Sequence, residues 1–535
     1  MPREWNFADV WETIADAIPT APAQVHGDVR HDWRTFDRRA AGVGAHLRSY
    51  GLGRHDKVAL YLYNTPHYLE AASAAMKASL VPVNTNYRYR HEELQYLWDN
   101  ADAAAVIFDA AFTDMVEAVR PNCPKVRAWI RVGGDGAPGL SWATSYDDAA
   151  ATALDPALRD ERSGDDPIFI YTGGTTGRPK GVIWRQGDLY LASNVTGDPV
   201  AADLAHVRER VLAAAARPVG LPAAPLMHGT GFVFAATILN RGGAVVTLPN
   251  QKFDAERLLA AIATHRVTDL CIVGDAFARP MADALDAAPG RHDLASLRVI
   301  SSSGMMWSKE VKARLLAHAP QLVMIDFLNS SEASGMGRAI TSGRGAASGA
   351  RFQLGTNAFV IDDDGAPVAP GSGKAGRVAV RGFVPLGYYK DPQRTAATFP
   401  VIEGVRCAVP GDHAVVEADG TITLLGRGSV SINTGGEKVF PEEVEEAIKT
   451  APGVSDAVVV GVPDPRLGQV VAALVAGSAA DVDAVKAHVR SQLAGYKVPR
   501  HVLVAASVER MPTGKADYNA VRARIEAWLQ QEGRP

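Results

Sequence analysis

The sequence has few cysteines and no hydrophobic run long enough to cross a membrane. Its three cysteines, Cys123, Cys271 and Cys407, stand far apart and form no C-x-x-C pair, which excludes a disulfide framework and gives no zinc signature. No apolar run reaches the roughly 18 residues of a membrane-spanning helix, and the charged first segment, MPREWNFADVWETIAD, has no signal-peptide core. We therefore expect a cytoplasmic protein without a membrane span.

The sequence also lacks an excess of charge of either sign. Its 55 Lys and Arg residues nearly balance the 59 Asp and Glu residues, for a net charge of −4. This balance argues against a nucleic-acid partner and against a polyanionic membrane surface. With 535 residues, 47% of them hydrophobic, the chain is long enough for about two to four globular domains.

What the sequence does contain is an alternation of short apolar runs with helical patterns. Residues 7–20 and 35–50 have helical periodicity, and residues 57–83 have the pattern of a strand, a helix and a second strand. Further apolar runs follow at 103–109, 126–132, 242–248, 269–274, 297–304 and 322–332. Strands that alternate with helices predict a parallel sheet with right-handed crossovers. From 350 to 425, short runs broken by Gly, Pro and Asp predict a small β subdomain.

A short glycine-bounded link, GRGS at 426–429, precedes a smaller α/β unit. The expected elements of this unit are helices at 441–450 and 481–494 and strands at 456–462 and 470–476. The predicted fold class is therefore α/β. We expect a large N-terminal domain, 1–428, of parallel-rich sheets flanked by helices with the small β subdomain, and a smaller, mobile C-terminal α/β domain, 429–535.

The most informative stretch is YTGGTTGRPKG, from Tyr171 to Gly181, which follows the apolar run PIFI. Glycines let backbone N–H groups approach phosphate oxygens, threonine hydroxyls add donors, and Lys180 adds a positive charge, so the pattern indicates a loop around the polyphosphate of ATP. A Walker A loop has Ser or Thr after its lysine, whereas Gly181 follows Lys180, which excludes a P-loop NTPase. The alternative is a flexible glycine-rich surface loop.

This loop closely resembles the phosphate loop of the adenylate-forming superfamily of acyl-CoA synthetases, peptide-synthetase adenylation domains and luciferases. The resemblance extends over almost the whole chain, through APLMHGTG, SSSGMMWS, DFLNSSEAS, GYYKDPQRTAATF, PGDHAVV, LLGRGSVSINTGGEKVFPEEVE and PTGK. Within the superfamily, the segments GYYKDPQRTAATF and GRGSVSINTGGEKVFPEEVEEA are most similar to actinobacterial fatty-acid and steroid-side-chain CoA ligases.

The resemblance implies a site for ATP and Mg²⁺. Glu332 would meet Mg²⁺ together with Thr175 or Thr176, because a hard cation on phosphates prefers oxygen ligands. Asp412 would accept the ribose hydroxyls, and Arg427 would contact ribose and phosphate. The other positions implied for the nucleotide are Thr172, Gly173, Gly174, Gly177, Gly304, Met305, Asn329, Ser330 and Ser331.

Three further residues have catalytic roles by the same resemblance. His228 stands where the family gates its acyl pocket, although a histidine between apolar residues is by itself more often a packed core residue. Lys180 and Lys515 would stabilise the charge that develops on the phosphates during adenylation.

The implied reaction has two steps. A carboxylate attacks the α-phosphorus of ATP to give an acyl-adenylate and pyrophosphate, and the thiol of CoA then attacks the acyl-adenylate. Between the steps, rotation of the small domain about Ser429 would carry Lys515 away. The turn that then enters the site contains Gly435, Gly436 and Lys438.

The expected substrate is a bulky apolar acid, either steroid- or terpenoid-like or a medium or long fatty acid. A roomy cavity is indicated by the small residues near the presumed acyl site, which are Gly229, Thr230, Gly231, Ala235, Ala236, Gly304 and Gly335. Besides this small-molecule carboxylic acid, ATP and CoA, a homodimer partner stays open as an alternative.

One residue departs from the family pattern. Asn329 stands where the family generally has glycine, and its side chain could crowd ATP and the carboxylate, so that the enzyme mainly thioesterifies a supplied acyl-adenylate. It could equally point away or form a harmless hydrogen bond. The other open alternatives are an adenylating enzyme that loads a carrier protein and a non-catalytic nucleotide-binding relative. Glu332, Asp412, Arg427 and Lys515 argue against the last of these.

Overall fold

The computed structural model divides the chain into two compact units, Met1–Gly349 with Val380–Ala408 and Ala350–Ala379 with Val409–Pro535. It describes residues 5–532 apart from 135–138, 154, 160–161, 173–177, 194–199, 306, 344, 347–350, 428–429, 431, 435–436, 465–466, 478–479, 494, 509 and 512–515. The predicted domain boundary at 428/429 lies outside the described residues and stays a prediction. Among the described helices, none is long and apolar enough to cross a membrane.

The first sheet of unit 1 is mostly parallel. Its strands lie in the order β2 (Val29–Asp32), β1 (Pro22–His26), β11 (Ala244–Thr247), β10 (Val219–Pro222), β12 (Asp269–Ile272), β13 (Val299–Ser303), β14 (Val323–Ser330) and β15 (Ala333–Ser342). The pairs from β1 to β14 are parallel, and the flanking strands β2 and β15 are antiparallel to their neighbours. The carboxyl ends of β10, β12, β13 and β14 therefore meet at one edge of the sheet.

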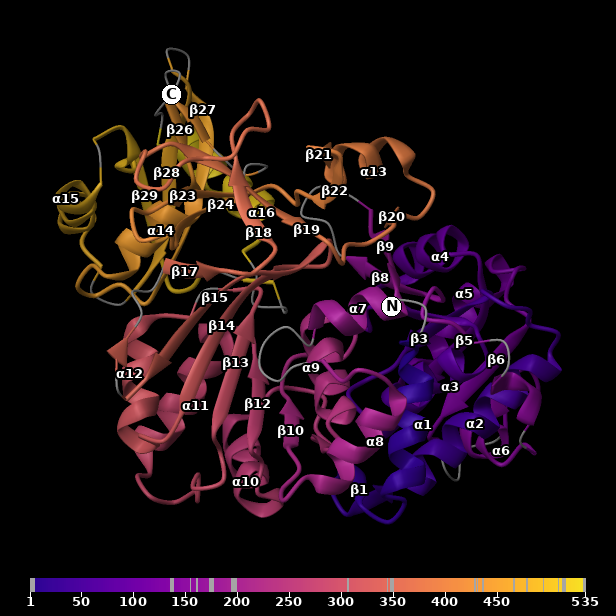
Figure 1. Cartoon of the computed structure of the whole chain (residues 1–535). Helices are drawn as coiled ribbons and strands as arrows, with labels where there is room; N and C mark the ends of the chain where they lie inside the picture. Colours follow the sequence, from indigo (N-terminus) through magenta and orange to yellow (C-terminus); the bar gives the residue numbers. More distant parts are fainter. Residues whose placement is uncertain are drawn as a thin grey trace. The chain divides into compact units, whose positions relative to one another are not determined.

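Helices cover this sheet on both faces (Figure 1). On one face, α10 (Ala255–His265), α11 (Asp275–Ala287) and α12 (Lys309–His318) bury Leu259, Met281 and Leu315 in one apolar cluster with strand residues. On the other face, α9 (Gly229–Asn240) packs so closely on β10 that a Cβ at Gly220 would lie 2.4 Å from the Ile238 side chain. The helix-covered parallel sheet confirms the predicted α/β class.

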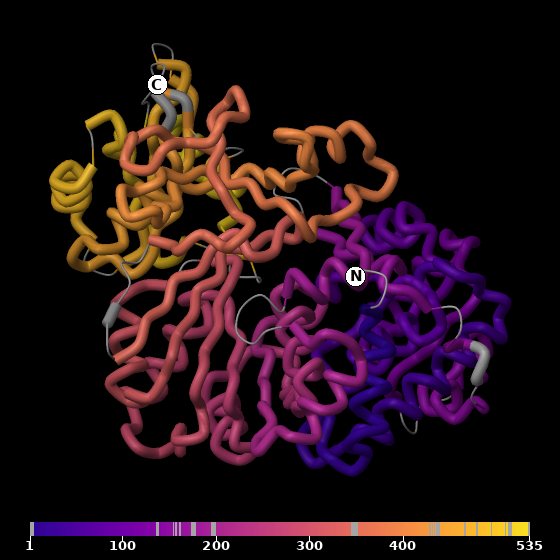
Figure 2. Tube along the Cα trace, viewed as in Figure 1, coloured from indigo at the N-terminus to yellow at the C-terminus, as the bar shows by residue number. Residues whose placement is uncertain are grey.

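The second sheet of unit 1 has the strand order β20 (Gly387–Tyr388), β9 (Lys180–Arg185), β8 (Pro167–Thr172), β4 (Val81–Asn84), β3 (Lys57–Tyr61), β5 (Ala103–Asp109), β6 (Ala128–Val132) and β7 (Thr144–Ser145). From β8 to β7 the strands pair in parallel, as predicted, but β8 and β9 are antiparallel. β20 comes from the late segment 380–408, which returns to this sheet, as the orange part of the trace beside the purple strands shows (Figure 2).

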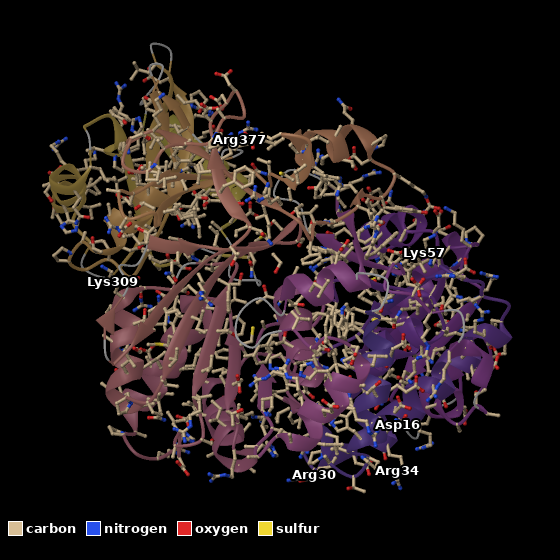
Figure 3. The ribbon with its side chains drawn as sticks, viewed as in Figure 1. Asp16, Arg30, Arg34, Lys57, Lys309 and Arg377 are labelled. Atoms are coloured by element: carbon tan, nitrogen blue, oxygen red, sulfur yellow. The ribbon has the colours of Figure 1, made fainter. Side chains whose placement is uncertain are left out.

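The helices begin and end close to their predicted bounds for identifiable reasons. α1 (Phe7–Ala17) is shorter than predicted, since the residue before Pro19 disfavours helical backbone. α2 (Trp33–Ser49) begins after Asp32, whose carboxylate accepts a hydrogen bond from the Thr35 amide at 2.8 Å. Charged side chains such as Arg30 and Arg34 are exposed on the surface of this unit (Figure 3).

Unit 2 contains two groups of paired strands. The first consists of β17 (Arg351–Leu354), β24 (Ile422–Arg427), β23 (Asp412–Val416), the start of β19 (Ala375–Arg381) and β18 (Ala358–Ile361). The second has the order β26 (Glu437–Val439), β25 (Ile432–Thr434), β28 (Gly468–Ala476) and β27 (Asp456–Asp464), with β29 (His501–Ala505) also on β28. The helices α14 (Pro441–Lys449), α15 (Val482–Gln492) and α16 (Tyr518–Gln531) complete the unit.

A buried charge network joins α1, α2 and α3 (Pro66–Lys77). The Arg162 guanidinium contacts Glu12 at 2.7 Å and Asp9 at 2.8 Å, and the Lys77 ammonium contacts Asp37 at 2.7 Å and Glu12 at 3.5 Å. Burial alone would raise the pKa of Glu12, but Lys77 and Arg162 outweigh it and lower this pKa to about 2. A buried carboxylate that is paired in this way stabilises the fold only while it is ionised.

We therefore expect a loss of stability in acid. Since the folded pKa of Glu12 lies below its ordinary value, its contribution, on the order of 3 kcal/mol, is complete above about pH 4.5 and is lost as the pH falls toward 2. Urea unfolding across this range should give a shallower pH dependence for Glu12→Gln than for the wild type. Asp16→Asn, on the exposed side of the same helix, is the control and should keep the wild-type slope. Equal slopes for Glu12→Gln and the wild type would contradict the assignment.

Candidate active site

The predicted phosphate loop joins two antiparallel strands. Thr172 at the end of β8 lies opposite Lys180 at the start of β9, and Tyr171 lies opposite Gly181. A Cβ at Gly181 would lie 2.6 Å from the Tyr171 ring, so only glycine allows this approach. The predicted residues Gly173, Gly174, Thr175, Thr176 and Gly177 lie outside the described residues. The structure therefore shows the two ends of the loop, where Thr172 and Lys180 stand across from each other.

Asn84, the last residue of β4, fixes the end of β8. Its side-chain amide donates hydrogen bonds to the carbonyl oxygens of Tyr171 at 2.9 Å and Met227 at 2.6 Å, and its carbonyl oxygen accepts one from the Tyr171 amide at 2.6 Å. Because Met227 directly precedes His228, this one side chain holds the phosphate hairpin against the turn that carries the histidine.

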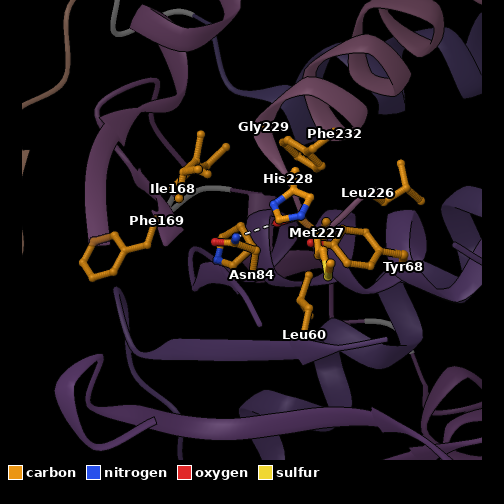
Figure 4. A pocket seen from close by; sticks show the side chains of 13 residues that line it. Leu60, Tyr68, Asn84, Ile168, Phe169, Leu226, Met227, His228, Gly229 and Phe232 are labelled. Carbon is orange, nitrogen blue, oxygen red and sulfur yellow. Dashed lines mark hydrogen bonds between the residues drawn. The ribbon is translucent and has the colours of Figure 1, made fainter. Parts of the chain in front are cut away.

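His228 caps the start of α9 and lines a small apolar cavity (Figure 4). The lining residues are Leu60, Tyr68, Ala72, Pro82, Asn84, Ile168, Phe169, Ile170, Leu226, Met227, His228, Gly229 and Phe232. The free volume is about 20 Å³, which is space for about one water molecule. A bulky acid therefore does not fit in this cavity as it stands, and the cavity marks the surroundings of His228 rather than the whole acyl site.

Gly304 and Met305 lie at the carboxyl edge of the first sheet, directly after β13. Gly304 has φ +91°, a left-handed conformation that side chains disfavour. Before it, the buried Ser302 hydroxyl accepts a hydrogen bond from the Gly274 amide at 2.9 Å, which ties β13 to the start of α11. Carboxyl ends of parallel strands are where open α/β sheets bind ligands.

Asn329 and Ser330 end β14 at the same edge and form part of a tight hairpin with β15. The Asn329 side-chain oxygen accepts a hydrogen bond from the Gly335 amide at 2.8 Å, and the Ser330 hydroxyl accepts from the amides of Glu332 at 3.2 Å and Ala333 at 3.1 Å. Asn329 thus satisfies a backbone donor of its own hairpin.

Glu332 projects from this hairpin and is held by a tyrosine. The Tyr388 hydroxyl donates a hydrogen bond of 2.8 Å to the Glu332 carboxylate, and the Trp184 indole donates one of 2.8 Å to the Ser331 carbonyl. Trp184 belongs to β9, which begins at Lys180, and Tyr388 belongs to β20, which pairs with β9. The strand that begins at Lys180 is therefore hydrogen-bonded to Ser331, and its neighbour β20 to Glu332, in one arrangement.

A buried ion pair joins α12 to β14, the strand that ends at this edge. The Lys312 ammonium of α12 contacts the Asp326 carboxylate of β14 and lies 5.3 Å from the centre of the Trp307 ring. Burial raises the pKa of Asp326, and Lys312 opposes that rise. The pair fixes α12 to the strand that leads to Asn329.

Among the described residues, no group of three or more His, Cys, Asp and Glu side chains could hold a metal ion by itself. A Mg²⁺ ion that is bound with nucleotide needs only one or two protein oxygens, because phosphates and water complete its shell. The Glu332 carboxylate fits that requirement.

The remaining predicted residues belong to unit 2. Asp412 on β23 is buried and lies opposite Arg427 on β24, so the two predicted ribose contacts are neighbours within one sheet. Lys438 lies on β26 opposite Asn433. The side chains of Arg427 and Lys438, and all of Gly435, Gly436, Ser429 and Lys515, lie outside the described residues.

At three of the positions whose small residues indicate a roomy acyl site, the local backbone already requires glycine. A Cβ at Gly231 would lie 2.4 Å from the Pro225 carbonyl oxygen, and Gly304 and Gly335 have φ of +91° and +74°. Ala235 and Ala236 are buried in α9. Open space is found beside Gly229 and Gly335: a Cβ at Gly229 would meet only Ile170 at 4.0 Å, and a Cβ at Gly335 would meet nothing within 4 Å.

Sequence reasoning missed the residues that connect the site. These residues make contacts between segments that are distant in the sequence. Asn84 binds the end of β8 and the turn before His228, Trp184 binds the Ser331 carbonyl, and Tyr388 binds the Glu332 carboxylate. Tyr388 lies within the segment GYYKDPQRT, which could have drawn attention to it, and Asn84 closes an apolar run. Trp184 gives no such signal, since it is an ordinary strand residue in the sequence.

A glycine-rich segment ends at Lys180, and the strand that follows is paired with the strand whose Tyr388 binds the Glu332 carboxylate, at the carboxyl edge of the parallel strands. This arrangement defines a nucleotide-dependent, adenylate-forming enzyme. Comparison with known proteins agrees: the AMP-binding enzyme family matches residues 11–389, and the AMP-binding enzyme C-terminal domain matches residues 443–515. The chain belongs to the AMP-binding enzyme family.

Curated relatives align with nearly the whole chain. A medium/long-chain-fatty-acid–CoA/3-oxocholest-4-en-26-oate–CoA ligase of Mycobacterium marinum is 40% identical, covering 98% of this chain and 97% of that protein. A 3-oxocholest-4-en-26-oate–CoA ligase of Rhodococcus rhodochrous is 39% identical, covering 96% and 94%. In fold, the crystal structure of an anthranilate CoA ligase with anthranoyl-AMP is similar, with a TM-score of 0.83, 21% identity and 99% coverage of both chains. These similarities confirm the predicted class, an AMP-forming acid–CoA ligase, whose co-substrates are ATP and CoA.

Proposed function

We propose that the protein activates a bulky apolar carboxylic acid as its CoA thioester, through an acyl-adenylate. The acid is steroid- or terpenoid-like, or a medium- or long-chain fatty acid. The observation that carries the proposal is the similarity, over 98% of the chain, to a ligase that is named for both kinds of acid. The hydrogen-bonded arrangement from Asn84 through the phosphate hairpin to Glu332 supports the adenylation chemistry.

In the proposed first step, the residues of unit 1 align the carboxylate with the α-phosphate. Lys180 and the loop amides bind the phosphates, a carboxylate oxygen bonds to the α-phosphorus, and pyrophosphate leaves. Glu332, together with Thr175 or Thr176, would hold Mg²⁺. Lys515 stabilises the charge on the α-phosphate. Mg²⁺ would neutralise negative charge on the phosphates.

In the proposed second step, the CoA thiol attacks the carbonyl carbon of the acyl-adenylate and AMP leaves. Gly435, Gly436 and Lys438 belong to the segment that admits CoA, and Asp412 and Arg427 hold the ribose of the adenylate through both steps. Rotation of the small domain about Ser429 would carry Lys515 away from the site and bring in the segment with Gly435, Gly436 and Lys438. We further propose that the enzyme acts in the cytoplasm, without a nucleic-acid partner, and that it could form a homodimer.

A panel of acids with ATP, Mg²⁺ and CoA tests the proposed substrate class. The kcat/KM for polycyclic acids or for fatty acids of medium and long chain should exceed that for acetate and propionate by about 10²-fold or more, since each buried CH₂ adds about 0.8 kcal/mol. Turnover confined to short acids would contradict the proposal. A carrier-protein thiol as the preferred acceptor instead of CoA would favour the carrier-loading alternative.

A second candidate is an enzyme with impaired adenylation, and Asn329 is the residue that favours it. Its side-chain oxygen is held by the Gly335 amide, so our main proposal expects Asn329→Gly to change the adenylation rate by less than about threefold while losing about 1 kcal/mol of stability with that hydrogen bond. Pyrophosphate release and thermal unfolding of the variant measure both quantities.

The rate from synthetic acyl-AMP and CoA serves as the control, because a joined adenylate needs no alignment of ATP with acid. If Asn329→Gly speeds pyrophosphate release about tenfold or more and leaves this control rate unchanged, the asparagine crowds the site and the second candidate is correct.

A further inference from the structure

Tyr388, the last residue of β20, holds the Glu332 carboxylate and is itself fixed through its backbone. Its hydroxyl donates a hydrogen bond of 2.8 Å to the carboxylate, and its amide donates one of 2.9 Å to the Thr395 hydroxyl. The next amide, that of Tyr389, donates to the Gly181 carbonyl at 2.8 Å, which continues the pairing of β20 with β9. The backbone on both sides of the tyrosine is therefore bound.

The two residues that follow β20 meet one aspartate from a distant part of the chain. Asp102 lies just after α4 (His91–Asn100). Its Oδ2 atom accepts a hydrogen bond of 2.8 Å from the Tyr389 hydroxyl and lies 2.8 Å from the Lys390 ammonium. Its Oδ1 atom lies 2.7 Å from the Lys125 ammonium. One carboxylate oxygen thus binds the segment after β20, and the other binds a lysine that precedes β6.

Asp102 belongs to a turn that is fixed to the same sheet. It has φ +52°, a left-handed conformation that is uncommon outside glycine, and its amide donates to the Asp99 carbonyl at 3.1 Å. Two residues before it, Asn100 accepts a hydrogen bond of 2.6 Å from the Tyr171 hydroxyl of β8. Lys390 is left-handed too, with φ +58°. Such conformations persist where the surrounding contacts hold them, and they gather at functional sites.

The contact between the turn and the tyrosine is charge-assisted. Burial would raise the pKa of Asp102, but its two lysine partners and Tyr389 outweigh it and lower that pKa. Burial and the Asp102 carboxylate raise the pKa of Tyr389 to about 12, so its hydroxyl keeps the proton that it donates. The Tyr389 ring also lies 4.8 Å from the Phe169 ring of β8. A protonated hydroxyl on an ionised carboxylate makes a stronger hydrogen bond than two neutral groups do.

We propose that Asp102 is a positioning residue for adenylation, which holds the segment after β20 so that the Tyr388 hydroxyl orients the Glu332 carboxylate. This inference rests on the role of Glu332 in the proposed function. A group that binds a reacting complex must be held within about 0.5 Å of its productive place by neighbours that are themselves locked by hydrogen bonds. Because the effect passes through Tyr388, removing the Asp102 charge should cost no more than removing the Tyr388 hydroxyl.

The first test measures binding to the full-length enzyme and needs no turnover. Calorimetry gives the Kd of α,β-methylene-ATP, which cannot release pyrophosphate, in EDTA and at saturating Mg²⁺. The ratio of the two values is the gain in affinity that Mg²⁺ supplies. Asp102→Asn should lower this ratio by about three- to tenfold, and Glu332→Gln should lower it at least as far. Asp99→Asn is the matched control, because Asp99 contacts Lys125 at 2.8 Å from the same turn, and it should keep the wild-type ratio.

The second test measures the two half-reactions. Asp102→Asn should slow pyrophosphate release from ATP and acid by about three- to tenfold and leave thioesterification of synthetic acyl-AMP within about twofold. Tyr389→Phe, which keeps the ring beside Phe169 and loses only the hydroxyl, should act in the same direction and guards against a loss of fold in Asp102→Asn. In a Tyr388→Phe background, Asp102→Asn should slow adenylation no further.

The outcomes separate this inference from the proposed function. If Glu332→Gln lowers the Mg²⁺ ratio while Asp102→Asn and Tyr389→Phe keep the wild-type value, the inference is wrong and the proposed function stands. If Glu332→Gln keeps the ratio, the proposed role of Glu332 is wrong and the inference falls with it. If Asp102→Asn slows both half-reactions equally, or slows adenylation further in the Tyr388→Phe background, Asp102 acts on the fold and the inference is overturned.

Discussion

Lys515→Ala should reduce the formation of acyl-AMP from ATP and acid by about 10²- to 10³-fold, while thioesterification of synthetic acyl-AMP changes by less than about threefold. The reason is that, in the proposed function, the ammonium group stabilises charge on the α-phosphate, and this charge develops during adenylation, before CoA reacts. Pyrophosphate release measures the first half-reaction, and acyl-CoA formation from acyl-AMP and CoA measures the second.

Lys486→Ala is the matched control, because Lys486 is a half-buried lysine of the same unit whose ammonium donates to the Arg500 carbonyl at 2.9 Å. It should leave both rates unchanged. An equal loss in both half-reactions for Lys515→Ala would mean that the lysine supports the fold instead of the phosphate chemistry.

Glu332→Gln should slow adenylation by about 10²-fold or more and weaken the dependence of the rate on Mg²⁺ concentration. The amide keeps the size of the side chain, but it lacks the negative charge that a hard cation requires. Tyr388→Phe should have a smaller effect in the same direction, about tenfold, since it removes the 2.8 Å hydrogen bond that orients the carboxylate. Titration of the pyrophosphate-release rate with Mg²⁺ measures both variants.

Glu310→Gln changes an exposed carboxylate on α12 of the same unit and should behave as the wild type. If Glu332→Gln kept both the rate and the Mg²⁺ dependence of the wild type, Glu332 would have no part in binding the metal. If Tyr388→Phe were as slow as Glu332→Gln, the tyrosine would have a role beyond orienting the carboxylate.

The alternation of apolar runs predicted most of the strands and helices. It could not predict whether neighbouring strands are parallel or antiparallel. Periodicity shows which residues face a core, and it is the same in parallel and antiparallel pairs. β8 and β9 are antiparallel, and the segment between them is too short to contain the crossover helix that a parallel pair requires. α11 was not predicted, and it contains Pro280, a residue that normally argues against a helix interior.

The candidate site could be predicted in part, because its motif residues stand in recognisable segments. Lys180 and Glu332 were identified through such segments, and Glu332 and the strand that begins at Lys180 lie in the hydrogen-bonded arrangement of unit 1. Tyr388, Trp184 and Asn84 could not be assigned, because their roles depend on which distant backbone they meet once the sheets have formed.

The most direct measurement of the central claim uses an acid labelled with ¹⁸O in its carboxylate, incubated with ATP, Mg²⁺, CoA and the enzyme. Attack of the carboxylate on the α-phosphorus places one labelled oxygen in the bridge of the acyl-adenylate, and attack of CoA on the carbonyl carbon leaves that oxygen on the phosphate of AMP. We therefore expect one ¹⁸O in each AMP, with one pyrophosphate and one acyl-CoA formed alongside it. Label in inorganic phosphate with ADP as the product, or unlabelled AMP, would contradict the account.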